Sequence, residues 1–316
     1  MTFRCVMISQ PSYLQVAKSQ LQITQDNEKY TVPLQDIACI VINHYSITLS
    51  ATLLSECAEN NIVMITCDKT HLPNGIFHSY LPHSRQNLVL KTQIQLTQPF
   101  KKRLWQTIVE QKITNQAMAL KHLCPLSLDI NKLTHLSQTV LSGDTNNNEA
   151  QASRIYFPAM FGGDFTRISK NRPATSQNIE YSEINGLLNY AYTIIRSLIC
   201  RSLVGYGLSP TLGLFHDNQL NAFNLADDFI EPYRPYIDWY IYAIVETAQK
   251  LELSTTIKAR LVDILNHIVI IDNKLTTLLN SIDVMVKSFI SCINENNFQL
   301  IKLPSLPQLI QRSNMD

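Results

Sequence analysis

Two widely separated segments of the chain carry residue types that hold divalent cations. Glu149 lies in the stretch 148–157, and His216, Asp228 and Glu231 lie close together downstream. Carboxylate oxygens combined with one imidazole nitrogen suit Mg²⁺ or Mn²⁺ better than a thiolate-seeking metal. A metal ion held in this way assists attack on a phosphodiester, provided that a basic surface holds the nucleic acid. The residue types therefore predict metal-assisted phosphodiester chemistry.

Each of these residues also has an ordinary structural explanation. Glu149 falls in the first turn of an expected helix, where a carboxylate interacts favourably with the helix dipole. His216 follows the apolar run 212–215 and is explained equally well as a hydrogen-bonded structural residue. Asp228 and Glu231 are three residues apart and could form a solvated acid pair on one helical face. The metal-site hypothesis gains weight only when the four residues are taken together.

Basic residues lie between and after the ligand segments. The stretch 165–178 contains Arg167, Lys170 and Arg172 and no acid, so we predict that it contacts DNA phosphates. The alternative is a solvated basic loop. Arg234 directly follows the acid pair and is predicted either to contact a phosphate or to pack in a corner of the fold.

Composition narrows the class of protein. The 316 residues carry a formal net charge of +1, yet the six Lys or Arg residues between positions 69 and 109 come with no acid, so one face can be basic. The seven cysteines are scattered without a Cys-x-x-Cys pair, which predicts reduced residues in a cytoplasmic protein. No apolar run approaches the roughly 18 residues of a membrane span, so we expect no membrane association.

Short strands followed by long helices are expected along the chain. Up to about residue 80, turn-forming residues separate short apolar segments, and one segment with a 3.6-residue period interrupts them. The turn at 70–75 and the stretch 82–86 are expected to link this module to the remainder. Strands are expected at 3–9, 12–17, 20–24, 29–33, 37–42 and 62–66, and helices at 48–59, 86–121, 127–141, 146–160, 180–205, 217–230, 233–250, 254–271 and 274–295. We therefore predict an α+β protein with a small N-terminal β-rich domain (1–82) and a larger all-helical catalytic domain (83–316).

The segments that hold these residues resemble, in order, the signature of the Cas-one family of CRISPR-associated integrases. They are Glu149–Phe157, Asn185–Tyr192, Gly207–His216 and Leu225–Pro235. The turn at 70–75 and the stretch 82–85 further resemble the type II branch of this family. The resemblance covers most of the chain.

The resemblance implies a metal-dependent DNA endonuclease and integrase of CRISPR adaptation, which inserts new spacers by attack of a 3′-hydroxyl on repeat DNA. Matched to the family motif, Glu149, His216 and Glu231 are the metal ligands and Asp228 is a second acid close to the site. The family commonly has Asp at the third ligand position where this chain has Glu231. Both Asp228 and Glu231 therefore remain candidates for direct contact, and we prefer Glu231.

The resemblance also implies a cofactor and partners. The cofactor would be Mg²⁺ or Mn²⁺, and the location the prokaryotic cytoplasm. The chain would form a homodimer through its N-terminal domain, bind double-stranded protospacer and repeat DNA, and assemble with the small Cas-two protein. A type II effector nuclease is a further candidate partner.

Two other functions fit the same residues. A non-catalytic DNA-binding scaffold, in which the acids cap helices and pair with arginines, would bind DNA without a metal. A stand-alone nuclease for branched DNA would cut without integrating.

Overall fold

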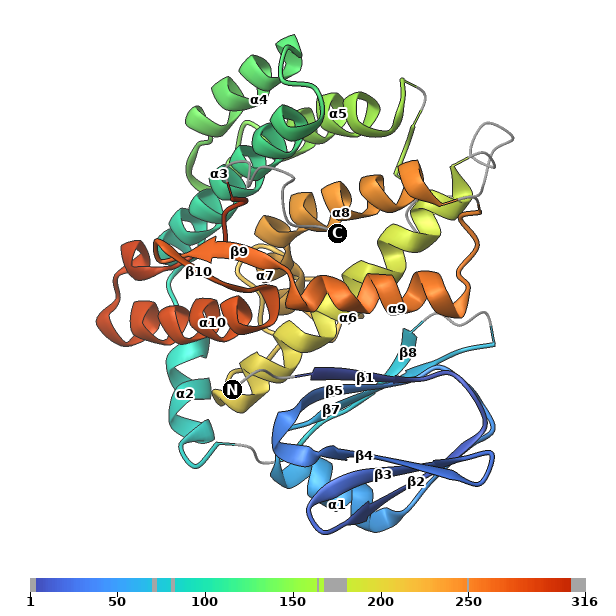
Figure 1. The fold of residues 1–316 in the computed structure, drawn as a ribbon. Coiled ribbons are helices and arrows are strands. Elements are labelled where there is room, and N and C mark those ends of the chain that lie inside the picture. The colour runs from blue at the N-terminus through green and yellow to red at the C-terminus, as the bar shows by residue number, and fades with distance from the viewer. Residues whose placement is uncertain are drawn as a thin grey trace.

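The computed structural model describes residues 4–69, 73–80, 83–163, 165–167, 181–248 and 250–307 of the protein. Two four-stranded β-sheets form its N-terminal part (Figure 1). The first sheet contains, in spatial order, β1 (Arg4–Ile8), β5 (Ile37–Ile42), β7 (Val63–Cys67) and β8 (Pro73–Phe77). The second contains β4 (Glu28–Pro33), β3 (Gln20–Gln25), β2 (Ser12–Ala17) and β6 (Ile47–Leu49). In the first sheet β1, β5 and β7 are parallel and β8 is antiparallel, whereas in the second only β2 and β6 are parallel.

An apolar core fills the space between these sheets and helix α1 (Ala51–Glu59). Leu14 of β2 and Ile40 of β5 are fully buried in it. Successive side chains of a strand point to opposite faces. Cys39 and Val41 therefore point away from this core, and they belong to a larger one shared with the helices. Because β5 is buried on both sides, its sequence is uninterruptedly apolar.

The remainder of the chain is mainly helical and packs against the first sheet (Figure 1). The helices are α2 (Gln86–Ile94), α3 (Gln98–Leu123), α4 (Leu128–Gln138), α5 (Asn148–Phe161), α6 (Ser182–Gly205), α7 (Asn224–Ile230), α8 (Arg234–Thr247), α9 (Thr255–Asp263) and α10 (Leu278–Glu295). Short 3-10 turns include η2 (Ser142–Asp144) and η4 (Glu231–Tyr233).

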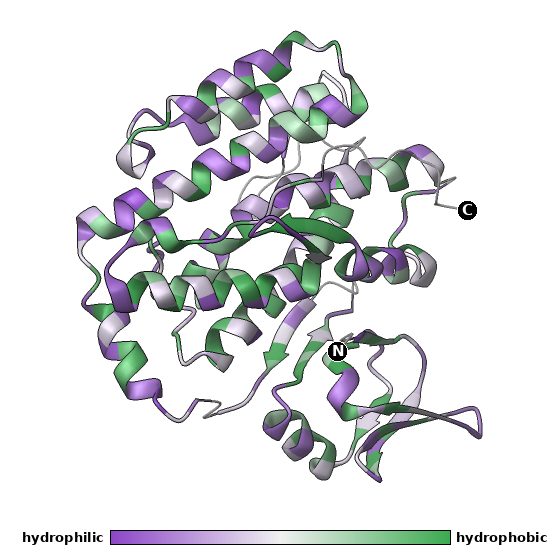
Figure 2. Ribbon diagram, turned by 60° about the vertical axis from the view of Figure 1, so that its left-hand side comes forward, coloured by the Kyte–Doolittle hydropathy of each residue, from purple (hydrophilic) through white to green (hydrophobic). Residues whose placement is uncertain are grey.

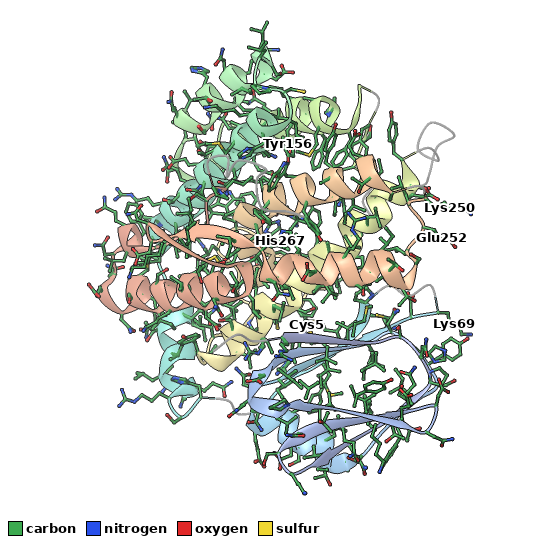
Figure 3. The ribbon with its side chains drawn as sticks, in the orientation of Figure 1. Cys5, Lys69, Tyr156, Lys250, Glu252 and His267 are labelled. Carbon is green, nitrogen blue, oxygen red and sulfur yellow. The ribbon has the colours of Figure 1, made fainter. Side chains whose placement is uncertain are left out.

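Helix α6 is buried along most of its length and packs against α7, α8, α9, α10 and strands of the first sheet. Cys5 of β1 lies at this junction between sheet and helices (Figure 3). Hydrophilic and hydrophobic residues alternate along most of the outer helices (Figure 2), as expected for helices that bury one face. Among the described helices, none is long and apolar enough to cross a membrane.

The predicted α+β class is confirmed, and the expected strands between 3 and 42 match the observed ones closely. Helix α1 begins after Ser50, whose side chain accepts a hydrogen bond from the amide of Leu53. The expected helix begins at residue 48, but residues 47–49 form strand β6 and Ser50 is the N-cap.

The expectation that the second domain is all-helical is wrong. Strands β9 (Ile268–Ile271) and β10 (Lys274–Thr277) form an antiparallel hairpin where parts of two helices were expected. Asp272 and Asn273 both have positive φ at the turn, which matches the twist of a two-residue hairpin. The apolar run at 268–271 is short, and such a run does not distinguish a strand from a helix.

Three further boundaries differ from the prediction. The expected turn at 70–75 overlaps β8, which begins at Pro73. The expected helix at 86–121 is two helices, because Thr97 caps α3 and Pro99 lies in its first turn. Residues 217–223 are not helical.

The expected domain boundary after residue 82 adjoins residues 81 and 82, which lie outside the described ranges. It stays a prediction, as does dimerisation through the first domain.

Candidate metal and nucleic-acid site

Helix α3 forms one wall of the candidate site. Trp105 and Lys112 are seven residues apart on it, about two helical turns, so they share one face. This face packs against α5 and η4, the two elements that carry Glu149 and Glu231. Residues remote in sequence therefore meet along α3.

The backbone of Glu149 is held by a residue outside its own helix. Asp144 in η2 accepts hydrogen bonds from the amides of Asn148 (2.8 Å) and Glu149 (3.1 Å) through its two carboxylate oxygens. These amides belong to the first turn of α5, where backbone N–H groups have no hydrogen-bond acceptor within the helix. Asp144 therefore caps the helix, and the Glu149 carboxylate is left to bind elsewhere. Its Oε1 lies 2.5 Å from Lys112 Nζ.

Glu231 is held on the other side of the same ammonium group. Its Oε1 accepts a hydrogen bond from Arg234 Nε at 2.8 Å, and its Oε2 lies 2.5 Å from Lys112 Nζ. Asn115 of α3 anchors the adjoining backbone by donating to the Pro232 carbonyl at 2.7 Å. Burial alone would raise the pKa of Glu231, but Arg234 and Lys112 outweigh it and lower this pKa to about 2. Glu231 is therefore ionised at neutral pH.

Asp228 is fully buried and binds the loop that carries His216. Its two oxygens accept from the amides of Leu214 (2.5 Å), Phe215 (3.3 Å) and His216 (3.1 Å), and from the Nδ1 atom of His216 (2.8 Å). A carboxylate that accepts four such bonds has no lone pair left for a metal ion. Nδ1 donates in this arrangement, so Nε2 is the acceptor of the neutral ring.

The loop before His216 is tightly folded. A Cβ added at Gly213 would meet the His216 carbonyl oxygen at 2.1 Å, so only glycine fits there. The Phe215 ring stacks on Trp105 with centroids 4.4 Å apart, and the His216 ring meets Trp105 edge-on. Burial lowers the pKa of His216, but the Asp228 carboxylate reverses this effect and raises it. The negative charge of Glu231 adds to the increase.

A cavity of about 490 Å³ opens beside Lys112. Its lining combines the two carboxylates with basic and aromatic side chains: Lys112, Gln116, Glu149, Ser153, Arg154, Phe157, Pro158, Phe165, Thr166, Arg167, Tyr192, Glu231, Arg234 and Asp238. Arg154 is exposed and lines the same cavity.

Two of the predicted phosphate-binding arginines lie in this cavity. Arg167 donates to the side-chain oxygens of Asn185 (2.6 Å) and Asn189 (3.0 Å), and its guanidinium lies over the Tyr192 ring. Arg234 also lies over the Tyr192 ring, 4.4 Å from its centroid. The other two predicted contacts, Lys170 and Arg172, lie outside the described residues.

The structure brings Glu149 and Glu231 together around Lys112 and places Asp228 behind His216. Among the described residues, no three His, Cys, Asp or Glu side chains are grouped as metal ligands would be, and the ammonium of Lys112 lies between Glu149 and Glu231. The metal assignment of Glu149, His216 and Glu231 stays a prediction. Lys112 was not predicted from the sequence. It lies among the apolar residues of the buried face of α3, such as Ile108 and Ile113, and a charged residue in such a pattern could have indicated a functional role.

A second buried carboxylate, Asp238 of α8, lies on the cavity wall. It accepts a hydrogen bond from the Tyr192 hydroxyl. Burial, and then the Asp238 carboxylate, raise the pKa of Tyr156 of α5, which is labelled in Figure 3. Burial raises the pKa of Asp238 to about 6, against the opposing effects of Tyr192, Arg167 and Arg234. Asp238 therefore takes up a proton just below neutral pH.

Comparisons by family model, by sequence and by structure all match this chain to Cas1 proteins or to proteins of the same fold. The family model described as CRISPR associated protein Cas1 matches residues 5–259. The CRISPR-associated endonuclease Cas1 of Neisseria meningitidis serogroup C (strain 8013) is 40% identical over 307 residues, 97% of each chain. A casposase bound to integration product has the same fold, with a TM-score of 0.74 at 18% identity over 94% of this chain and 91% of that one. A Cas6-RT-Cas1–Cas2 complex also gives a TM-score of 0.74 at 18% identity, over 98% of this chain and 36% of that one.

The raised pKa of Asp238 predicts a pH dependence of stability. The stabilising contribution of its protonated form is fully present below the unfolded-state value of 3.8 and is lost as pH rises through about 6. Asp238→Asn keeps an acceptor for Tyr192 but does not titrate. We expect the free energy of unfolding of the wild type to fall by up to about 3 kcal/mol relative to this variant between pH 4 and 7, as measured by urea denaturation. Asp26→Asn in the exposed β3–β4 turn is the control, and parallel curves for wild type and Asp238→Asn would contradict the assignment.

Proposed function

Because the chain belongs to the CRISPR-associated Cas1 family, we propose that it is a metal-dependent DNA endonuclease and integrase of CRISPR adaptation. The observation that carries this proposal is the convergence of Glu149 and Glu231 on one buried cation, beside His216 and a cavity lined by arginines. Glu149 and Glu231 both form ion pairs within the protein, so neither is explained only as a helix cap or as a solvated surface acid.

The residues present fit a divalent ion. A cation, the Lys112 ammonium, already lies between the two carboxylates. Among the described residues, Glu231 Oε2 has no hydrogen-bond partner although it is buried, so its contact with Lys112 is an ion pair of poor hydrogen-bond geometry. We propose that Glu149, Glu231 and Nε2 of His216 hold Mg²⁺ or Mn²⁺. Asp228 would then be a positioning residue, since its oxygens are saturated by the loop.

The proposed reaction divides the work among these residues. When bound, the metal ion would polarise the scissile phosphate and offset charge on the leaving oxygen. Asp228 keeps the His216 ring in one tautomer and orientation. Arg154, Arg167 and Arg234 would hold DNA phosphates at the cavity, so that a 3′-hydroxyl is placed for in-line attack. Water in the place of this hydroxyl would give endonuclease cleavage.

Partners are proposed from the relatives. The casposase structure holds an integration product and the Cas1–Cas2 structure is a complex of the two proteins. By analogy, we propose that this chain binds double-stranded protospacer and repeat DNA and assembles with a Cas2 protein. Homodimerisation through the sheets, membership of the type II branch and contact with its effector nuclease belong to the same proposal.

Removal of a proposed ligand should abolish strand transfer. We expect Glu149→Ala and His216→Ala to lower insertion of a 3′-hydroxyl oligonucleotide into a repeat-containing plasmid by at least about 100-fold in Mg²⁺ or Mn²⁺. Asp228→Asn should lower it by roughly 10- to 100-fold, as expected for a residue that orients a ligand. The exposed Glu183→Ala and His135→Ala variants are matched controls.

Three outcomes would overturn parts of this proposal. Full activity of Glu149→Ala and His216→Ala would show that the site is wrongly assigned. DNA binding without turnover and without any effect of chelator would indicate a scaffold. Cleavage of branched DNA without insertion would indicate a stand-alone nuclease.

The cavity should contribute to DNA affinity through charge. Arg154 is exposed and lines the cavity, so Arg154→Ala should weaken binding of duplex DNA and lower the slope of log affinity against log salt by about one. Fluorescence anisotropy over a salt series measures both quantities. Lys29→Ala on β4 removes an equal charge from the N-terminal sheets and should leave the slope closer to that of wild type. Equal slopes for Arg154→Ala and wild type would exclude a phosphate contact there.

A further inference from the structure

We propose that Lys112 is a built-in counter-cation that keeps the metal site neutral and assembled until a divalent ion displaces its ammonium group. The inference rests on the proposed function, because it takes Glu149 and Glu231 as metal ligands. It adds a residue that sets how tightly and when the metal binds.

The contacts of Lys112 are those of a cation at the centre of a site. Its Nζ atom lies 2.5 Å from an oxygen of Glu149 and 2.5 Å from an oxygen of Glu231. Only 7% of the Lys112 side chain and 7% of the Glu231 side chain are exposed. Arg234 binds the remaining oxygen of Glu231. The two acids and two cations together carry no net charge.

Packing alone does not account for a lysine at this position. The neighbours of Lys112 on the buried face of α3 include Ile108, Val109 and Ile113, which are fully buried. Apolar side chains in place of Lys112 and both acids would pack there without the cost of removing charges from water, and such replacement of a whole buried ion pair is often neutral or stabilising. What an apolar side chain could not do is hold two carboxylates side by side, because like charges at short range repel.

A divalent ion and this ammonium group cannot occupy the same position. Mg²⁺ binds carboxylate oxygens at about 2.1 Å, so an ion between Glu149 and Glu231 would take the space that Nζ now fills. Lys112 also lines the 490 Å³ cavity, and its four-carbon stem is flexible, so the ammonium has room to leave. Metal binding must therefore break a buried ion pair with Glu231 and a partly exposed one with Glu149, which lowers the affinity for the metal. In return, the metal-free site keeps its carboxylates in place.

Isothermal titration with Mn²⁺ alone tests this role. Lys112→Met keeps the length of the side chain and removes its charge. We expect this variant to bind Mn²⁺ about tenfold or more tightly than wild type, because a competing cation is gone. We also expect its metal-free melting temperature to fall by roughly 5–15 °C, since the buried Glu231 and the partly exposed Glu149 lose their shared partner, and to recover in Mn²⁺. Lys132→Met removes an exposed lysine that pairs with Asp129 at 2.8 Å, and it should change neither quantity.

The outcomes separate this inference from the proposed function. If wild type binds Mn²⁺ and Glu149→Gln weakens that binding, the ligand assignment holds, and equal or weaker binding by Lys112→Met overturns the role of Lys112 alone. If wild type binds no Mn²⁺, the proposed metal site fails and the inference fails with it. A crystal structure of the wild type with Mn²⁺ decides the question even if Lys112→Met does not fold. Displacement of Nζ from at least one carboxylate supports the inference, and retention of both ion pairs overturns it.

Discussion

A single buried ammonium group joins the segments on which the candidate site depends. Lys112 of α3 lies between Glu149 at the start of α5 and Glu231 at the start of η4, and these three residues are far apart in sequence. Without a cation there, two carboxylates would face each other in a mostly buried setting, and one of them would take up a proton or move away. The surrounding structure serves this arrangement: Asp144 caps α5, and Asn115 anchors the backbone beside Glu231.

The hydrogen bonds of Asp228 form a second constraint, which is local. One carboxylate fixes the backbone of residues 214–216 and the imidazole of His216 at the same time. The ring is further held by Trp105, which also supports Phe215. The imidazole is therefore oriented before any ligand arrives, which reduces the entropy lost on binding. Trp105 and Lys112 share one face of α3, so the same helix positions both halves of the site.

Two of the cavity's arginines, Arg167 and Arg234, are held in fixed orientations by neighbouring side chains. Arg167 is bound by two asparagine side chains, and Arg234 by Glu231, while both lie over Tyr192. A guanidinium that is already oriented loses less entropy when it binds a phosphate. Arg154 is exposed on the same cavity and adds a third positive charge. These cations therefore surround the acids at the place where a DNA phosphate is proposed to lie.

Sequence by itself determined the features that depend on near neighbours. The strands up to residue 42, the body of helix α1 and the position of Glu149 in the first turn of its helix follow from local periodicity. Residue types and their order also indicated a metal site and the family. Only the tertiary structure decided which acid faces the shared cation, because Asp228 and Glu231 have the same chemistry and differ in the segments packed around them. It likewise decided that residues 268–277 form a hairpin and that Lys112 lies at the centre of the site. Both depend on long-range packing, which local sequence patterns do not encode.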